Sequence, residues 1–131
     1  MPPLGQRATM APQRCQAEVK TMRTGPVPAQ AIRGFAQEVA ARFRPQRIVL
    51  FGSHARGTAT ADSDVDLLVV METPARAIKQ AQGIRLAVPR SFGLDLVVKT
   101  PAELARWIAL GDTFLADVLK QGTVLYERAD A

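Results

Sequence analysis

Two aspartates, Asp64 and Asp66, stand two positions apart at the start of a short β-rich run. Side chains two apart on a strand point to the same face, so we expect both carboxylates to lie together. Like charges held this close repel each other unless a cation lies between them. Mg²⁺ is the natural occupant, because it prefers oxygen ligands and leaves coordination positions for substrate phosphates.

A third carboxylate, Asp95, comes from the middle of the next predicted strand, within the otherwise apolar run 94–98. Burying a carboxylate in such a run is costly without a partner, and a metal shared with Asp64 and Asp66 would supply one. Two metal ions held by three carboxylates suit a reaction in which one metal activates a hydroxyl and the other steadies a triphosphate. Asp95 could also be the general base that takes the hydroxyl proton.

The segment just before these acids offers contacts for phosphate. Gly52 and Ser53 follow a predicted strand where the chain turns into a possible helix start. Gly52 permits close backbone approach, and N–H groups at a helix start suit phosphate oxygens. The Ser53 hydroxyl can add a hydrogen bond, and Arg56 can add positive charge. A Gly-Ser pair alone is more often a plain turn, but beside the three acids it predicts a site for a nucleoside triphosphate.

Two other phosphate and metal motifs do not fit. A calcium loop beginning at Asp62 would need glycine where Leu67 stands and glutamate where Thr73 stands. Residues 52–57 have the glycine spacing of a Walker A loop, but Thr58 follows where that loop requires lysine.

Two aromatic side chains have more ordinary interpretations than ligand binding. His54 is the only histidine and has no companion ligands, which favours a loop-surface or phosphate-adjacent role over metal binding. Trp107 stands among Leu104, Ile108 and Leu110 at helical spacing, which is typical of a core position.

Hydrophobic periodicity predicts the elements that must position these residues. Apolar residues recur every three or four positions over 29–43, and shorter helical segments are expected at 74–88, 101–110 and 113–120. Strands are expected at 48–51, 65–70 and 94–98, with a final strand or extended tail at 123–126, and 52–63 is a loop with room for one helical turn. The fold class is therefore α/β (α+β), a small mixed sheet flanked by helices, within one domain at 26–131.

Charge and composition limit the setting. The net charge of +5 divides into +6 over residues 1–47 (eight basic, two acidic) and −1 over 48–131 (nine basic, ten acidic). Residues 1–25 read as a flexible basic arm, and the absence of interleaved aromatics there disfavours nucleic acid as a direct ligand. A single cysteine, Cys15, and no membrane-length apolar run favour a cytoplasmic protein without a membrane partner.

The Gly52-Ser53 pair, Arg56-Gly57, and the run Ser63-Asp64-x-Asp66 resemble the signature of the DNA polymerase β-like nucleotidyltransferase superfamily. Within it, the chain is most similar to the minimal nucleotidyltransferases, or MntA-like proteins, over about residues 29–126. The resemblance implies a nucleotidyltransferase fold, triphosphate contacts at Gly52 and Ser53, two Mg²⁺ ions at Asp64 and Asp66, and completion of the site by Asp95.

The same resemblance implies a biological role. Many such proteins are antitoxins of type VII toxin–antitoxin systems, which transfer AMP from ATP to a tyrosine of a partner HEPN-domain RNase and so block the toxin. A HEPN toxin is therefore the expected partner. Two alternatives stay open: an antitoxin that only occludes its partner, through the apolar region 107–126, and a nucleotidyltransferase acting on a small molecule or an RNA 3′ end.

Overall fold

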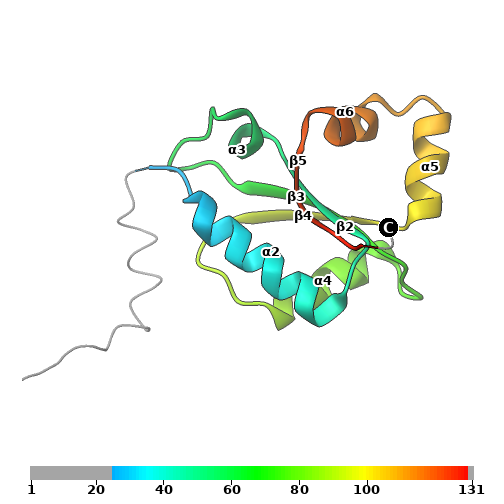
Figure 1. Ribbon diagram of the computed structural model, residues 1–131, viewed down its shortest axis with the longest axis horizontal. Coiled ribbons are helices and arrows are strands. Elements are labelled where there is room, and N and C mark those ends of the chain that lie inside the picture. Colours follow the sequence, from blue (N-terminus) through cyan, green and yellow to red (C-terminus); the bar gives the residue numbers. More distant parts are fainter. Residues whose placement is uncertain (1–24, 130–131) are drawn as a thin grey trace, which may run out of the picture.

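A four-stranded mixed sheet forms the centre of the protein in a computed structural model, which describes residues 25–129 (Figure 1). Its strands lie in the order β4-β3-β2-β5. β2 pairs antiparallel with both β3 and β5, whereas β3 and β4 run parallel. The strand bounds are Arg47–Phe51 for β2, Val65–Val70 for β3, Leu94–Lys99 for β4 and Thr123–Glu127 for β5.

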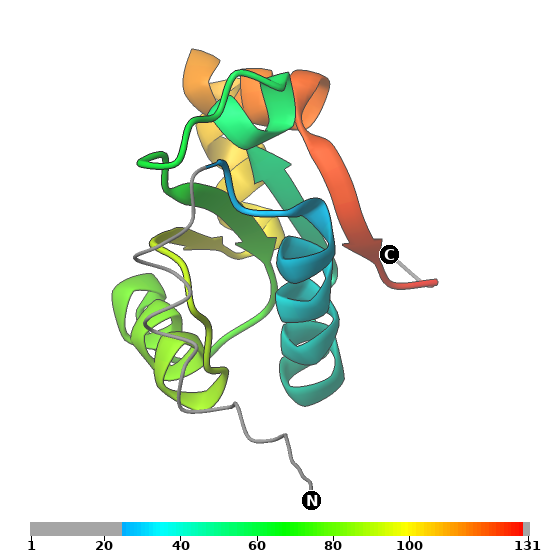
Figure 2. The same ribbon diagram turned by 90° about the vertical axis from the view of Figure 1, so that its left-hand side faces the viewer.

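Helices cover both faces of this sheet (Figures 1 and 2). α2 (Ala29–Phe43) and α4 (Ala77–Ala87) lie on one face, and α5 (Pro101–Ala109) and α6 (Thr113–Gln121) lie on the other. The single-turn helix α3 (Ser53–Arg56) follows β2 at one end of the sheet. The parallel β3–β4 pair is connected through α4, because parallel neighbours need a crossover rather than a tight turn.

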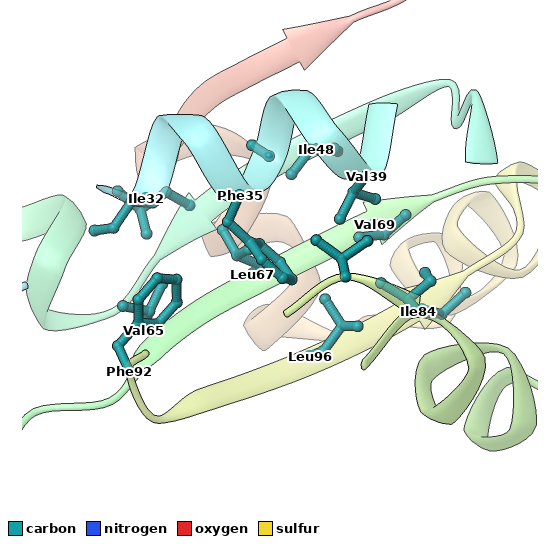
Figure 3. Packing of buried hydrophobic residues seen from close by; sticks show 14 of the residues in the cluster. Ile32, Phe35, Val39, Ile48, Val65, Leu67, Val69, Ile84, Phe92 and Leu96 are labelled. Atoms are coloured by element: carbon teal, nitrogen blue, oxygen red, sulfur yellow. The ribbon is translucent and has the colours of Figure 1, made fainter. Parts of the chain in front are cut away.

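Successive side chains of a strand point to opposite faces of the sheet, and this alternation divides the core into two clusters. Val65, Leu67 and Val69 of β3 face α2, where they pack with Phe35 and other buried side chains of that helix (Figure 3). Leu68 and Val70 belong to the second cluster, with residues of α5 and α6. Both faces of β3 are therefore buried along most of its length. Asp66 is on the same face as Leu68 and Val70, but it lies near the start of β3 and is only partly buried.

Most predicted elements are confirmed, and α4 is the main correction. The helix predicted at 74–88 begins only at Ala77. The chain before it is held in a turn by Thr73, whose hydroxyl accepts from the Ala75 N–H at 3.1 Å and donates to Gln80 Oε1 at 2.7 Å. A side chain that bonds nearby groups in this way competes with helical hydrogen bonding. The predicted basic arm, apart from its last residue Gly25, lies outside the described residues.

α5 confirms one prediction and corrects another. Thr100 and Glu103 form the expected capping box, with Thr100 Oγ1 accepting from the Glu103 N–H at 3.1 Å. The prediction that Trp107 is a core residue is wrong, since its side chain is 45% exposed; Leu110 is exposed as well. Of the four residues Leu104, Trp107, Ile108 and Leu110, only Leu104 is buried, because α5 packs against the sheet through a narrow face.

None of the helices within residues 25–129 is both long and apolar enough to cross a bilayer.

Gly122 allows α6 to end against β2, and we predict that Gly122→Ala destabilises the fold. A Cβ there would collide with the Val118 carbonyl and the Val49 side chain. Forced overpacking of this kind costs about 1–3 kcal/mol, measurable as a lower unfolding midpoint. Gly34→Ala is the control, because a Cβ there meets open space on helix α2. It should stabilise the protein by about 0.5–1 kcal/mol. Equal effects at both positions would contradict the packing account.

Candidate active site

Asp66 and Asp95 form one row across the sheet. The register of the parallel pair sets Asp66 directly beside Asp95, as it sets Leu68 beside Val97. Both aspartates therefore point to the face that carries α5 and α6, beyond the end of the apolar cover. The predicted meeting of these two carboxylates is confirmed, and it comes from the pairing of two strands 29 positions apart in the chain.

Asp64 precedes β3 and is held near the same place. A Cβ on Gly93, the residue before β4, would collide with the Asp64 carboxylate, and a Cβ on Gly52 would collide with that of Asp66. The two carboxylates thus occupy space that a side chain at position 52 or 93 would fill. Gly52 also has φ 77° and ψ −156°, a conformation open essentially to glycine alone. The sequence argument used Gly52 but missed Gly93.

Electrostatic repulsion is concentrated on Asp66. Partial burial raises the pKa of this carboxyl group, and the negative charges of Asp95 and then Asp64 raise it further. His54 and Arg56 oppose the shift without cancelling it. A carboxylate that must stay ionised beside two others is stabilised by a bound cation.

The burial argument for Asp95 is wrong, although its position is as predicted. Asp95 is exposed, and so is Asp64; only Asp66 of the three is partly buried. β4 is an edge strand, so an acidic residue within its apolar run can face solvent at no desolvation cost. The need to pair a buried charge therefore applies to Asp66 rather than to Asp95.

A cavity of about 500 Å³ opens beside this row, within the usual range for small-molecule sites. Four predicted site residues line it: Gly52, Arg56, Asp66 and Asp95. Ser53 and Asp64, the other two, are not among the lining residues.

The far wall of the cavity comes from α6, through Phe114, Asp117 and Gln121. Sequence reasoning gave these residues no role. Their spacing of three and four along a predicted helix was the available signal, because it sets them on one face.

α3 contributes Ala55 and Arg56 to the lining of the cavity, and its short length limits what its dipole can do. It has four residues and begins directly after Gly52, whose carbonyl accepts from the N–H groups of Ala55 and Arg56 at 3.1 Å. A helix dipole needs aligned peptide units, so a single turn contributes little. The guanidinium of Arg56 is the charged group that α3 contributes to this lining, and it suits a triphosphate because it can donate several hydrogen bonds to phosphate oxygens.

His54 links α3 to the acidic loop. Its Nδ1 lies 3.1 Å from the backbone oxygen of Asp64. The ring therefore contacts the backbone of the residue that carries one carboxylate, and the loop-surface or phosphate-adjacent role of His54 stays a prediction.

The donor set fits a metal that also binds substrate. No group of three or more His, Cys, Asp or Glu side chains within residues 25–129 is arranged as a complete metal site. Mg²⁺ does not require one, since it is usually bound by one or two carboxylates together with substrate phosphates. The Asp66–Asp95 row and the adjacent Asp64 offer such carboxylates at the mouth of a cavity that also contains Arg56.

Comparisons with a family model and with a related protein both point to nucleotidyltransferases. Residues 32–125 match a family model described as "Nucleotidyltransferase domain". The chain is also similar to a protein of Methanocaldococcus jannaschii named "Putative protein adenylyltransferase MJ0604", with 42% identity over 101 residues. That match covers 74% of this chain and 96% of the relative.

Among solved structures, a "putative nucleotidyltransferase" from Sulfolobus solfataricus aligns with a TM-score of 0.54 and 21% identity, over 86% of this chain and 88% of that one. At this identity the likeness supports the fold alone. A crystal structure of a toxin–antitoxin with AMP-PNP aligns with a TM-score of 0.49 and 23% identity, over 75% of each chain. This second likeness is too weak to carry a functional conclusion.

We predict that Asp66→Asn stabilises the metal-free protein at neutral pH. Because the pKa of Asp66 is raised, its contribution to stability is fully present below pH 3.8, the ordinary value, and is lost as pH rises through the folded-state pKa. Removing the partly buried and repelled charge should raise the Tm in EDTA by no more than a few degrees, because solvent screens a group that is only partly buried. Asp62→Asn, at an exposed position in the loop before β3, is the control and should change little. A lower Tm for Asp66→Asn would show that the carboxylate is favourably paired instead.

Proposed function

The chain belongs to the nucleotidyltransferase domain family and is a nucleotidyltransferase, and from that premise we propose that it transfers AMP from ATP to a hydroxyl group of another protein. The observation that carries this proposal is the row of Asp66 and Asp95 beside Arg56 in one cavity. The relative named as a protein adenylyltransferase, matched over nearly its whole length, supports a protein as the acceptor.

The proposed reaction is a displacement at the α-phosphorus of ATP. The acceptor hydroxyl oxygen forms a bond to that phosphorus, the bond from the α-phosphorus to the bridging oxygen of the β-phosphate breaks, and pyrophosphate leaves. Asp95 takes the hydroxyl proton, a role open to it because it is exposed at the mouth of the cavity. Arg56 and the turn at Gly52-Ser53 hold the phosphates on the opposite side.

Asp64 and Asp66, with Asp95, would hold two Mg²⁺ ions together with the triphosphate. Bound Mg²⁺ neutralises phosphate charge and favours ionisation of the hydroxyl. The raised pKa of Asp66 supports this proposal, because a carboxylate left in mutual repulsion gains most from a cation. Gly52 and Gly93 keep the space in which Asp66 and Asp64 lie.

The finer proposal concerns the acceptor. We propose that it is a tyrosine of a cognate HEPN-domain RNase toxin, with this chain as the cytoplasmic antitoxin that inactivates it. Support comes from the resemblance to the minimal nucleotidyltransferases at Gly52-Ser53, Arg56-Gly57, Asp64 and Asp66. A binding-only antitoxin is the second candidate, favoured by two exposed apolar side chains: Phe114, which lines the cavity, and Trp107, which lines a neighbouring hollow with it.

One experiment separates the two candidates. The full chain, ATP and Mg²⁺ are incubated with the product of the neighbouring gene, tested as the HEPN toxin, and AMP addition is read by intact mass alongside RNase activity. We expect the doubly substituted protein Asp64→Asn, Asp66→Asn to lose AMP transfer by about 10²–10³-fold or more, the scale of removing preorganised charge at a reacting centre.

Neutralisation of the RNase should be lost together with AMP transfer. If the doubly substituted protein still neutralises the RNase, binding alone is the function. If the unchanged protein adds no AMP to an active toxin, the toxin is not the acceptor.

A pair of glycines tests the site itself. Gly57→Ala strains a left-handed backbone with φ 78° and ψ 18°, at about 1–2 kcal/mol. Gly52→Ala strains the more restricted conformation at φ 77° and ψ −156°, at up to about 3 kcal/mol, and only the Cβ at position 52 collides with Asp66. We expect Gly52→Ala to lower AMP transfer by about 10²-fold, because a catalytic group moved by 1 Å can cost that much. Gly57→Ala should keep most of its activity and lower the Tm by less. Equal activity losses would mean that strain, not the position of Asp66, is responsible.

A further inference from the structure

β4 leaves the outer edge of the sheet open at Leu96 and Val98, whereas the outward Leu94 carbonyl already accepts from the Arg85 guanidinium at 3.2 Å. Within residues 25–129 β4 pairs only with β3. The carbonyls of Gly93 and Lys99 accept from the N–H groups of Val65 and Met71, at 2.9 and 3.0 Å. Bonded residues alternate along a strand, so the N–H and C=O groups of Leu96 and Val98 point away from β3. These groups can pair with another extended segment.

Hollows flank this open edge on both faces of the sheet. One, of about 330 Å³, lies between β4 and α4, where Ile78, Ala81 and Arg85 form its outer wall. The other, of about 340 Å³, lies between β4 and the α5–α6 face, against Trp107 and Phe114. Figure 2 shows α4 on one side of the sheet and α5 with α6 on the other. Val97 lines both hollows and the catalytic cavity as well.

Exposed apolar side chains are gathered around these hollows. Ile78 is 75% exposed, Phe114 52% and Trp107 45%, and each lines one of the two. A strand paired with β4 would direct alternate side chains to opposite faces, one set toward Ile78 and the other toward Trp107 and Phe114. An open edge with pockets for alternate side chains is how proteins recognise extended peptides by strand addition.

The position of Asp95 identifies the occupant. Asp66 and Asp95 are neighbours in one row across the sheet, and a strand added to β4 would extend that row by one residue. Directly opposed residues of neighbouring strands have side chains about 5 Å apart, within reach of the Asp95 carboxylate. Whatever pairs with this edge therefore delivers a side chain to the reacting centre.

We propose that the acceptor protein presents an extended segment that pairs with the outer edge of β4, with its hydroxyl-bearing residue beside Asp95. This inference rests on the proposed transfer of AMP to a protein. The residues on either side of the acceptor residue point toward Ile78 and are apolar. A residue two positions away points toward Trp107 and Phe114 and is also apolar. The recognition element is thus a short strand with a central hydroxyl and apolar neighbours.

The test uses two nine-residue peptides as probes with the full chain. The first has tyrosine at its centre, two valines on each side, then threonine and a terminal lysine. The second has proline in place of the valines next to the tyrosine, so it lacks the N–H groups needed for pairing. Amide exchange at Leu96 and Val98 is followed by NMR, and AMP transfer is followed by intact mass with ATP and Mg²⁺.

We expect the valine peptide, and not the proline peptide, to slow amide exchange at Leu96 and Val98 by at least 10-fold. AMP transfer should favour the valine peptide by a similar factor. Ile78→Lys and Trp107→Ala should remove both effects. The matched controls Leu86→Lys and Leu110→Ala should keep them, because these side chains are 88% and 68% exposed and line neither hollow.

Several outcomes would overturn the proposal. One is the absence of added protection with the valine peptide. Another is protection already present without peptide, which assigns the edge to a second copy if light scattering shows a dimer and to residues 1–24 if it shows a monomer.

Free N-acetyl-tyrosinamide separates this proposal from the proposed function. If AMP is transferred to N-acetyl-tyrosinamide and neither peptide is preferred over the other, the strand-pairing proposal is refuted and the adenylyltransferase function stands. Protection by the valine peptide without AMP transfer to any acceptor refutes the adenylyltransferase function and leaves the pairing intact.

Discussion

The partial burial of Asp66 beside two other carboxylates is the constraint on which the site depends. Asp66 is at its centre, partly buried, with Asp95 beside it in the sheet and Asp64 two residues before it. A fold selected for stability alone would have no reason to keep such a group. The surroundings tolerate it because Gly52 and Gly93 leave room for the carboxylates and because one side of the row is open to a large cavity. Stability is thus lower here than it could be, as is common at sites prepared to bind a charged ligand.

The sheet provides the rigidity that this arrangement needs. β3 is buried on both faces over most of its length, between α2 on one side and α5 with α6 on the other. Its register with β2 and β4 is therefore strongly specified, since a shift by one residue would turn buried side chains to the wrong face. The same register that buries Leu67 and Leu68 also sets Asp66 beside Asp95. The pairing of β3 with β4 therefore determines both the packing of the core and the alignment of the two carboxylates.

The edge position of β4 explains why an acidic residue and exposed apolar side chains occur together around this strand. An acidic residue on an open edge is a common device against unwanted strand pairing. Asp95 has that location, but Ile78, Trp107 and Phe114 around the same edge are exposed and apolar, which is the opposite of protection. An edge that is acidic at Asp95 and apolar on both flanks suits a selective partner rather than none.

The amino-acid sequence by itself determined the types and order of the elements and the identity of the acidic residues. Helical periodicity over 29–43 predicted α2, and the apolar run at 65–70 predicted β3; Asp64, Asp66 and Asp95 were recognisable from residue chemistry and family likeness. It did not determine exposure, as Asp95 and Trp107 show, because exposure depends on which strand is at the edge and how helices tilt on the sheet. Gly93, Asp117 and Gln121 were missed for a related reason: their importance comes from long-range neighbours. Only the tertiary structure decided that two strands pair in parallel, and that pairing brings Asp66 and Asp95 into one row.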